Sequence, residues 1–186
     1  MIWNIPIALT WLRVLLIPVF TLLFLLAPYP DANWVNYTAA TVFIIAALTD
    51  WFDGFLARRW QQTSDFGAFL DPVADKLMVA VALILLVYLS RTNPLAAIII
   101  IGREITISAL REWMAQVGKR DSVAVARIGK FKTAAQMTAI IMLLIQDIPF
   151  LPLDLLFIGN VLMGIACVLT LWSMFHYLWA AYKALR

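Results

Sequence analysis

The sequence predicts an all-α integral membrane protein with six transmembrane helices in one bundle. Of its 186 residues, 64% are hydrophobic and only 13% are charged, whereas soluble domains average about 45–50% apolar and about 25% charged residues. The apolar residues are gathered in runs of roughly the 20 residues that a helix needs to cross a bilayer. These runs cover residues 12–26, 35–56, 69–89, 95–114, 124–145 and 155–182. We therefore expect residues 1–186 to form a single membrane domain.

Turn-forming sequence separates the six predicted spans. Proline, glycine, asparagine and aspartate mark most of the breaks, as they do at turns and loops. The breaks fall at residues 28–31, 61–65, 91–94, 118–121 and 149–154. The second, fourth and fifth spans run into polar sequence at one end, and we expect these helices to continue from the hydrocarbon core into the interface.

Lysine and arginine are distributed unevenly between the gaps. The first gap (28–34) and the last gap (146–154) contain neither residue, and the third contains only Arg91. The other gaps and the C-terminal end hold Arg58, Arg59, Arg111, Lys119, Arg120, Arg127, Lys130, Lys132, Lys183 and Arg186. Because basic residues favour the cytoplasmic side of a membrane, both termini are expected to be cytoplasmic. Basic residues placed between apolar spans also argue against nucleic acid as a partner.

Four aspartates interrupt the second and third apolar runs. Asp50 and Asp53 are three residues apart near the end of the second span, and Asp71 and Asp75 are four apart at the start of the third. Either spacing places a pair on one face of a helix. A short connection makes the two helices antiparallel neighbours, so the four carboxylates are expected to face one another. Charges inside spans are costly and usually functional.

Four neighbouring carboxylates repel one another unless some are protonated or cations neutralise them. Hard oxygen ligands favour Mg²⁺, Mn²⁺ or Ca²⁺ over Zn²⁺. Four anionic side chains suit a pair of divalent ions, which is a recurring arrangement in phosphoryl chemistry. The alternatives are polar residues that join helices, or the ion path of a cation transporter.

Small residues and an arginine accompany the aspartates. Gly54 follows Asp53, Ala57 lies about one turn later, and Gly67 lies about one turn before Asp71. Small side chains let a ligand or a neighbouring backbone approach closely. Arg58 is suited to binding a phosphate oxygen.

These residues, at this spacing, resemble the signature of the CDP-alcohol phosphatidyltransferases. All eight signature positions are present: Asp50, Asp53, Gly54, Ala57, Arg58, Gly67, Asp71 and Asp75. Further segments resemble the branch of that family that uses glycerol 3-phosphate. They are Asn4–Pro6 with Thr10 and Arg13, Arg103–Glu104, Ser108–Trp113, Gly129–Thr133 and Gln136.

The resemblance implies six transmembrane helices, a homodimer, and Mg²⁺ or Mn²⁺, as two ions held by the four aspartates. It places Gly54, Ala57, Arg58 and Gly67 around the cytidine diphosphate part of the donor, CDP-diacylglycerol. Asp75 is the implied general base, although spacing alone does not decide which carboxylate takes that role. Thr10 and Arg13 are expected to close the donor site, with capping or snorkelling as an equal alternative. The expected location is a bacterial-type inner (cytoplasmic) membrane.

The acceptor is predicted from basic residues at the ends of the fourth and fifth spans. Arg103, Arg111, Lys130 and Lys132 form a candidate pocket for an acceptor's phosphate, such as that of glycerol 3-phosphate. Ordinary topology signals and attraction to anionic lipids explain the same charges. Alternative functions are transfer to inositol phosphate or serine, and a membrane transferase that uses prenyl diphosphates.

Overall fold

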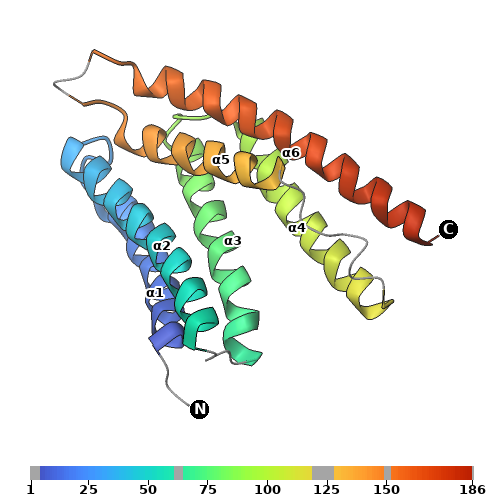
Figure 1. Ribbon diagram of the computed structural model, residues 1–186. Coiled ribbons are helices and arrows are strands. Elements are labelled where there is room, and N and C mark those ends of the chain that lie inside the picture. Colours follow the sequence, from blue (N-terminus) through green and yellow to red (C-terminus); the bar gives the residue numbers. More distant parts are fainter. Residues whose placement is uncertain (1–4, 61–64, 119–127, 149–151, 186) are drawn as a thin grey trace.

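The computed structural model describes residues 5–60, 65–118, 128–148 and 152–185. These residues form α-helices, with no strand among them (Figure 1). The helices are α1 (Ile5–Leu26), α2 (Asn33–Trp60), α3 (Asp65–Tyr88), α4 (Pro94–Gln116), α5 (Ile128–Ile145) and α6 (Leu155–Leu185). The predicted all-α class is therefore confirmed, and the described part of each predicted apolar run lies on one helix, except for Leu89, which directly follows α3.

The helices extend beyond the predicted spans. α1 begins at Ile5 rather than at residue 12, and α2 continues to Trp60. The predicted break at 61–65 is wrong at its end, because Asp65 is already part of α3. A hydropathy pattern marks the apolar stretch, whereas a helix continues wherever its backbone hydrogen bonds continue. The fifth predicted span starts at residue 124, and its first four residues lie outside the described part.

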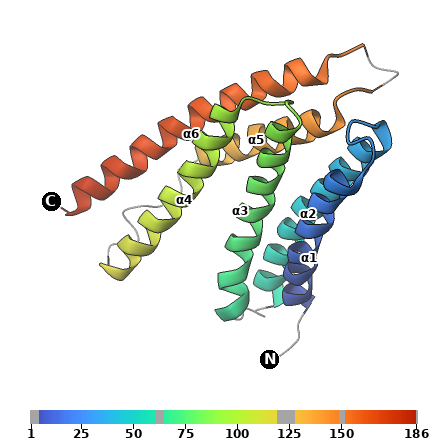
Figure 2. The same ribbon diagram turned by 180° about the vertical axis from the view of Figure 1, so that it is seen from behind.

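The six described helices run in alternating directions. Figures 1 and 2 show α1, α2 and α3 beside one another, while α5 and α6 form an antiparallel pair that extends towards α4. α1 packs against α2 and α3, α2 also packs against α5, and α4 packs against α6. The main core includes Phe20, Phe24, Phe43, Leu83 and Ile140, all nearly inaccessible to solvent.

A buried arginine joins the connections at one end of the bundle. Arg91, only 4% exposed, donates to the side chains of Asp31 (2.8 Å) and Asn36 (2.7 Å) and to the carbonyl of Leu144 (3.2 Å). The side chain of Asn160 donates to the Arg91 carbonyl. These bonds therefore hold the α3–α4 connection to the α1–α2 connection and the start of α2, to the last turn of α5 and to the start of α6. The end of α2 and the start of α3 lie at the opposite end (Figure 1).

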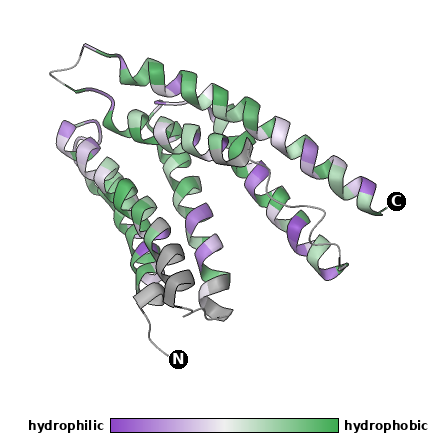
Figure 3. Cartoon of the chain, viewed as in Figure 1, coloured by the Kyte–Doolittle hydropathy of each residue, from purple (hydrophilic) through white to green (hydrophobic). Residues whose placement is uncertain are grey.

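Large apolar side chains cover the outside of the helices. Exposed examples are Leu22 on α1, Ile84 on α3, Ile98 on α4 and Val168 on α6, and Figure 3 shows the apolar colour along most of the helices. A soluble monomer rarely exposes continuous apolar surface on this scale. Among the described residues, Ala8–Leu26 and Leu155–Leu185 are long and apolar enough to cross a bilayer. These features fit a membrane protein.

The close approach of α5 and α6 requires a glycine. A Cβ atom added to Gly159 on α6 would lie 2.9 Å from Cγ of Leu143 on α5, and Leu143 is itself fully buried. At Gly164, also on α6, an added Cβ would meet nothing within 4 Å. The two glycines therefore form a matched pair for testing this interface.

We expect Gly159→Ala to destabilise the protein and Gly164→Ala to leave it unchanged or slightly more stable. Overpacking a filled core typically costs about 1–3 kcal/mol, while alanine gains up to about 1 kcal/mol over glycine inside a helix. Thermal unfolding of both purified variants in the same detergent tests this expectation. Equal unfolding temperatures would show that α5 and α6 are not packed as described.

Candidate active site

Carboxylates from two helices meet at one arginine. Nη1 of Arg13, on α1, lies 3.1 Å from Oδ1 of Asp50 on α2 and 2.5 Å from Oδ1 of Asp75 on α3. Arg13 is only 1% exposed, whereas the two carboxylates are roughly two-fifths exposed. The charged atoms therefore meet on the side of the bundle where α2 ends and α3 begins.

A second side chain of α1 binds the neighbouring carboxylate of α3. The hydroxyl of Thr10 donates a hydrogen bond to Oδ1 of Asp71. Thr10 and Arg13 are three residues apart, a spacing that places two side chains on the same face of a helix. The same reasoning places Asp71 and Asp75 on one face of α3. Helix α1 thus orients both of these aspartates.

The buried charge of Arg13 is balanced by these partners. A buried arginine is tolerated when carboxylates pair with it, and removing the partners leaves an uncompensated charge. Contact of Thr10 and Arg13 with the donor stays a prediction. What the structure adds is their direct contact with the predicted metal ligands.

A small cavity continues from this cluster into the bundle. Its volume is about 40 Å³, which is enough for more than one water. Arg13, Asp50 and Asp75 form its charged end. Its other walls are mainly apolar and come from Phe43, Ala46, Ala47, Met78, Val79 and Met137. The charged groups are therefore confined to one end of the cavity, and its other walls are mainly apolar.

The donor atoms around Arg13 suit a hard divalent cation. They are carboxylate oxygens, together with the Thr10 hydroxyl, and such ligands favour Mg²⁺ or Mn²⁺. Among the side chains that the structure describes, no group of three or more metal-ligating residues is close enough to hold an ion. The predicted set includes Asp53, whose side chain lies outside that description. The two-ion site therefore stays a prediction.

Several predicted site residues cannot be placed beyond their helix. Gly54, Ala57 and Arg58 belong to the last turns of α2, and Lys130 belongs to the first turn of α5. Their side chains lie outside the described residues. Gly67 is described, and it is buried in the first turn of α3.

A second charged cluster joins α4, α5 and α6. Glu104 accepts a hydrogen bond from Lys132 of α5, and one of its oxygens lies 3.1 Å from Arg103. Arg103 also donates to the Ser173 hydroxyl and lies over the ring of Tyr177. The structure therefore brings together two of the predicted acceptor-binding cations, and it places a carboxylate between them.

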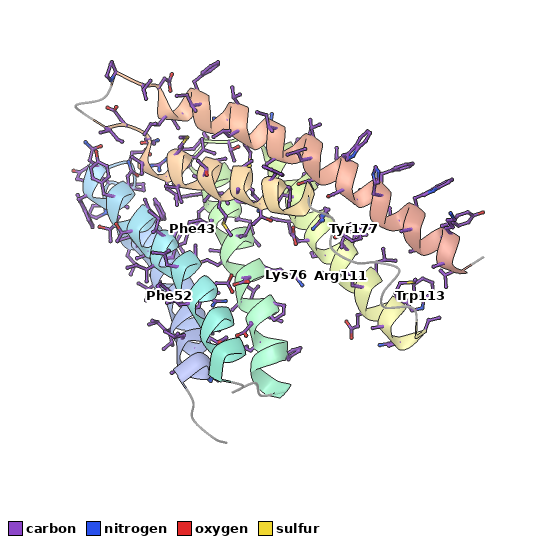
Figure 4. The ribbon with its side chains drawn as sticks, in the orientation of Figure 1. Phe43, Phe52, Lys76, Arg111, Trp113 and Tyr177 are labelled. Carbon is purple, nitrogen blue, oxygen red and sulfur yellow. The ribbon has the colours of Figure 1, made fainter. Side chains whose placement is uncertain are left out.

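Two further cations are Arg111 on α4 and Lys76 on α3. Arg111 is exposed and lies about 12 Å along α4 from Arg103, at 1.5 Å per residue. Figure 4 shows Lys76 pointing away from α1 and α2, towards the side of α4. Our sequence reasoning did not select Lys76. Its position directly after Asp75 was the available signal, but a lysine near the end of a span is also an ordinary topology signal.

Comparisons with known proteins agree with the motif. The sequence model described as CDP-alcohol phosphatidyltransferase matches residues 3–172. The CDP-diacylglycerol–glycerol-3-phosphate 3-phosphatidyltransferase of Escherichia coli (strain K12) is 54% identical over 181 residues, which are 96% of this chain and 95% of the relative. The protein of the same name from Sodalis glossinidius is 55% identical over 96% of this chain and 94% of its own length. That from Shigella flexneri is 54% identical, with 96% and 95% covered.

Proposed function

Because the chain belongs to the CDP-alcohol phosphatidyltransferase family, we propose that it transfers the phosphatidyl group of CDP-diacylglycerol to glycerol 3-phosphate. The products are phosphatidylglycerophosphate and CMP, as expected of an enzyme of phospholipid biosynthesis. Relatives that are 54% identical over nearly the whole chain carry the name of this reaction. The structural observation that supports it most is the meeting of Asp50 and Asp75 at Arg13.

We infer that Asp50, Asp53, Asp71 and Asp75 hold Mg²⁺ or Mn²⁺, two ions in all. When bound, such ions neutralise the donor's diphosphate and stabilise the departing CMP. Oxygen donors from α2 and α3, oriented by Thr10 and Arg13, support this assignment. Gly54, Ala57, Arg58 and Gly67 then lie around the cytidine diphosphate group, as in the family signature.

The residues of the chain supply proton transfer and orientation. Asp75 takes the proton of the acceptor's hydroxyl, whose oxygen attacks the phosphorus attached to diacylglycerol. Arg13 fixes the orientation of the Asp75 carboxylate through its 2.5 Å contact. Catalysis in phosphoryl transfer is largely positioning and electrostatic stabilisation, so a rigid set of carboxylates suits it.

The proposed membrane arrangement is six spans with the active site and both termini at the cytoplasmic side. The alternating helix directions place the end of α2, the start of α3 and the end of α4 on one side (Figure 2). The lysine and arginine distribution makes this the cytoplasmic side. The membrane is then the bacterial inner membrane, and the expected homodimer stays a prediction.

The acceptor is tested by supplying the purified protein with CDP-diacylglycerol and one alcohol at a time. We expect CMP release with glycerol 3-phosphate to be at least about tenfold faster than with serine or inositol phosphate. A site built for glycerol 3-phosphate leaves some of its polar groups unpaired when another acceptor binds. Reactions without an acceptor measure hydrolysis of the donor.

Two outcomes would contradict the proposal. CMP release that prefers serine or inositol phosphate would assign the chain to another reaction of the family. Cation flux through liposomes without CMP release would support a transporter instead. A prenyl diphosphate substrate is tested in the same assay by replacing the donor.

A further inference from the structure

Helix α3 lies between the two charged clusters and presents different residues to each. Asp71 and Asp75 are directed to Thr10 and Arg13 on α1. Lys76 directly follows Asp75, so it leaves the helix about 100° further round the axis. Its side chain points towards the side of α4 on which Arg111 is labelled (Figure 4). Two adjacent residues of α3 therefore point in different directions, Asp75 towards the carboxylate site and Lys76 towards α4.

The cations of the second cluster differ in their availability. Lys132 has a side chain only 4% exposed, and it is paired with Glu104. Arg103 shares the same carboxylate, so a soluble phosphate would have to displace Glu104 to reach either residue. Lys76 is half-buried and Arg111 is exposed. Within the described part of the chain, neither has a hydrogen-bond or ion-pair partner.

The charges near Glu104 favour an anion with two negative charges. Lys76 is close enough to Glu104 for their charges to interact, and Arg103 and Lys132 contact the same carboxylate. Asp75, next to Lys76, is paired with Arg13 of α1, so cations outnumber carboxylates around Glu104. A phosphate monoester carries roughly −1.5 to −2 charges at pH 7, so the balance suits the phosphate of a soluble acceptor.

This inference rests on the proposed function: we propose that Lys76 binds the phosphate of the acceptor and thereby brings the acceptor's hydroxyl to the neighbouring Asp75. Arg111 is on α4, the helix towards which the Lys76 side chain points (Figure 4). Glu104 is a positioning residue that keeps Lys132 and Arg103 in place behind the phosphate. The acceptor and the base are then coupled through two consecutive residues of α3.

The test is steady-state kinetics of Lys76→Met and Lys76→Arg, with each substrate varied in turn. Lys183→Met is the matched control, because Lys183 is exposed in the last turn of α6. A charge-assisted hydrogen bond contributes enough for the KM of glycerol 3-phosphate to rise about tenfold to a hundredfold in Lys76→Met. The KM of CDP-diacylglycerol should change by less than about twofold, and Lys76→Arg should retain most of the affinity for glycerol 3-phosphate.

Inorganic phosphate provides a second measurement that does not require turnover to be normal. It should inhibit the unsubstituted protein in competition with glycerol 3-phosphate, and it should inhibit Lys76→Met about tenfold less strongly. An unchanged KM for glycerol 3-phosphate in folded Lys76→Met would overturn the inference, and so would an equal rise in both KM values. If the unsubstituted protein released no CMP with glycerol 3-phosphate, the proposed function itself would fail, together with this inference.

Discussion

Asp75→Asn is expected to lower turnover by about 10³-fold or more while the protein stays folded. The substitution keeps the shape of the side chain but removes its charge and its ability to accept a proton. General bases typically contribute about 10²–10⁴-fold, and here the same change also removes a proposed metal ligand. The change should appear in turnover at saturating concentrations of both substrates.

Asp147→Asn is the matched control for this substitution. Asp147 is exposed beside the α5–α6 connection, where its backbone carbonyl accepts a hydrogen bond from Tyr37. That connection lies at the end of the bundle opposite the proposed site (Figure 1). Turnover of Asp147→Asn should therefore match that of the unsubstituted protein. Near-normal turnover of Asp75→Asn would show that the aspartates are structural.

Removal of divalent cations is expected to abolish turnover without unfolding the chain. The charge stabilisation supplied by a metal ion is worth several kcal/mol, which corresponds to a rate factor of about 10³ or more. Arg13 contacts both Asp50 and Asp75, so we expect part of the carboxylate charge to stay neutralised after the ions are removed. The fold should therefore survive chelation.

The measurement is CMP release before chelation, after chelation, and after Mg²⁺ or Mn²⁺ is added back. Thermal unfolding of the same samples reports on the fold. Recovery on addition of either ion would separate a catalytic loss from irreversible damage. Full turnover after exhaustive chelation would contradict the metal assignment for the four aspartates.

Much of the fold follows from hydropathy, but the helix ends do not. Apolar runs of about 20 residues are sufficient to predict the helices. Asp65 and the first turn of α3 escape this pattern, since polar residues at a helix end are indistinguishable from a loop by hydropathy. The role of Arg91 was also beyond the sequence, because its partners come from α1–α2, α5 and α6.

The carboxylates of the candidate site were predictable because charges are unusual in apolar runs. Their partners were not. Arg13 and Asp75 are 62 residues apart in the sequence, and no periodicity within one helix connects residues on different helices. The pairing of Lys132 with Glu104 likewise depends on how α4 and α5 pack. The structure shows that Arg103 and Lys132 are paired with Glu104, whereas Arg111 is exposed. The sequence alone did not make this distinction, and it did not indicate a role for Lys76.

Transfer of a phosphatidyl group to glycerol 3-phosphate is measured most directly through the lipid product. Purified protein, CDP-diacylglycerol, Mg²⁺ and radiolabelled glycerol 3-phosphate should yield a labelled lipid with the mass of phosphatidylglycerophosphate. One CMP should be released for each labelled lipid formed, and Asp75→Asn should form almost none. Release of CMP without label in the lipid fraction would show that the protein hydrolyses the donor, and this would contradict the proposed transfer.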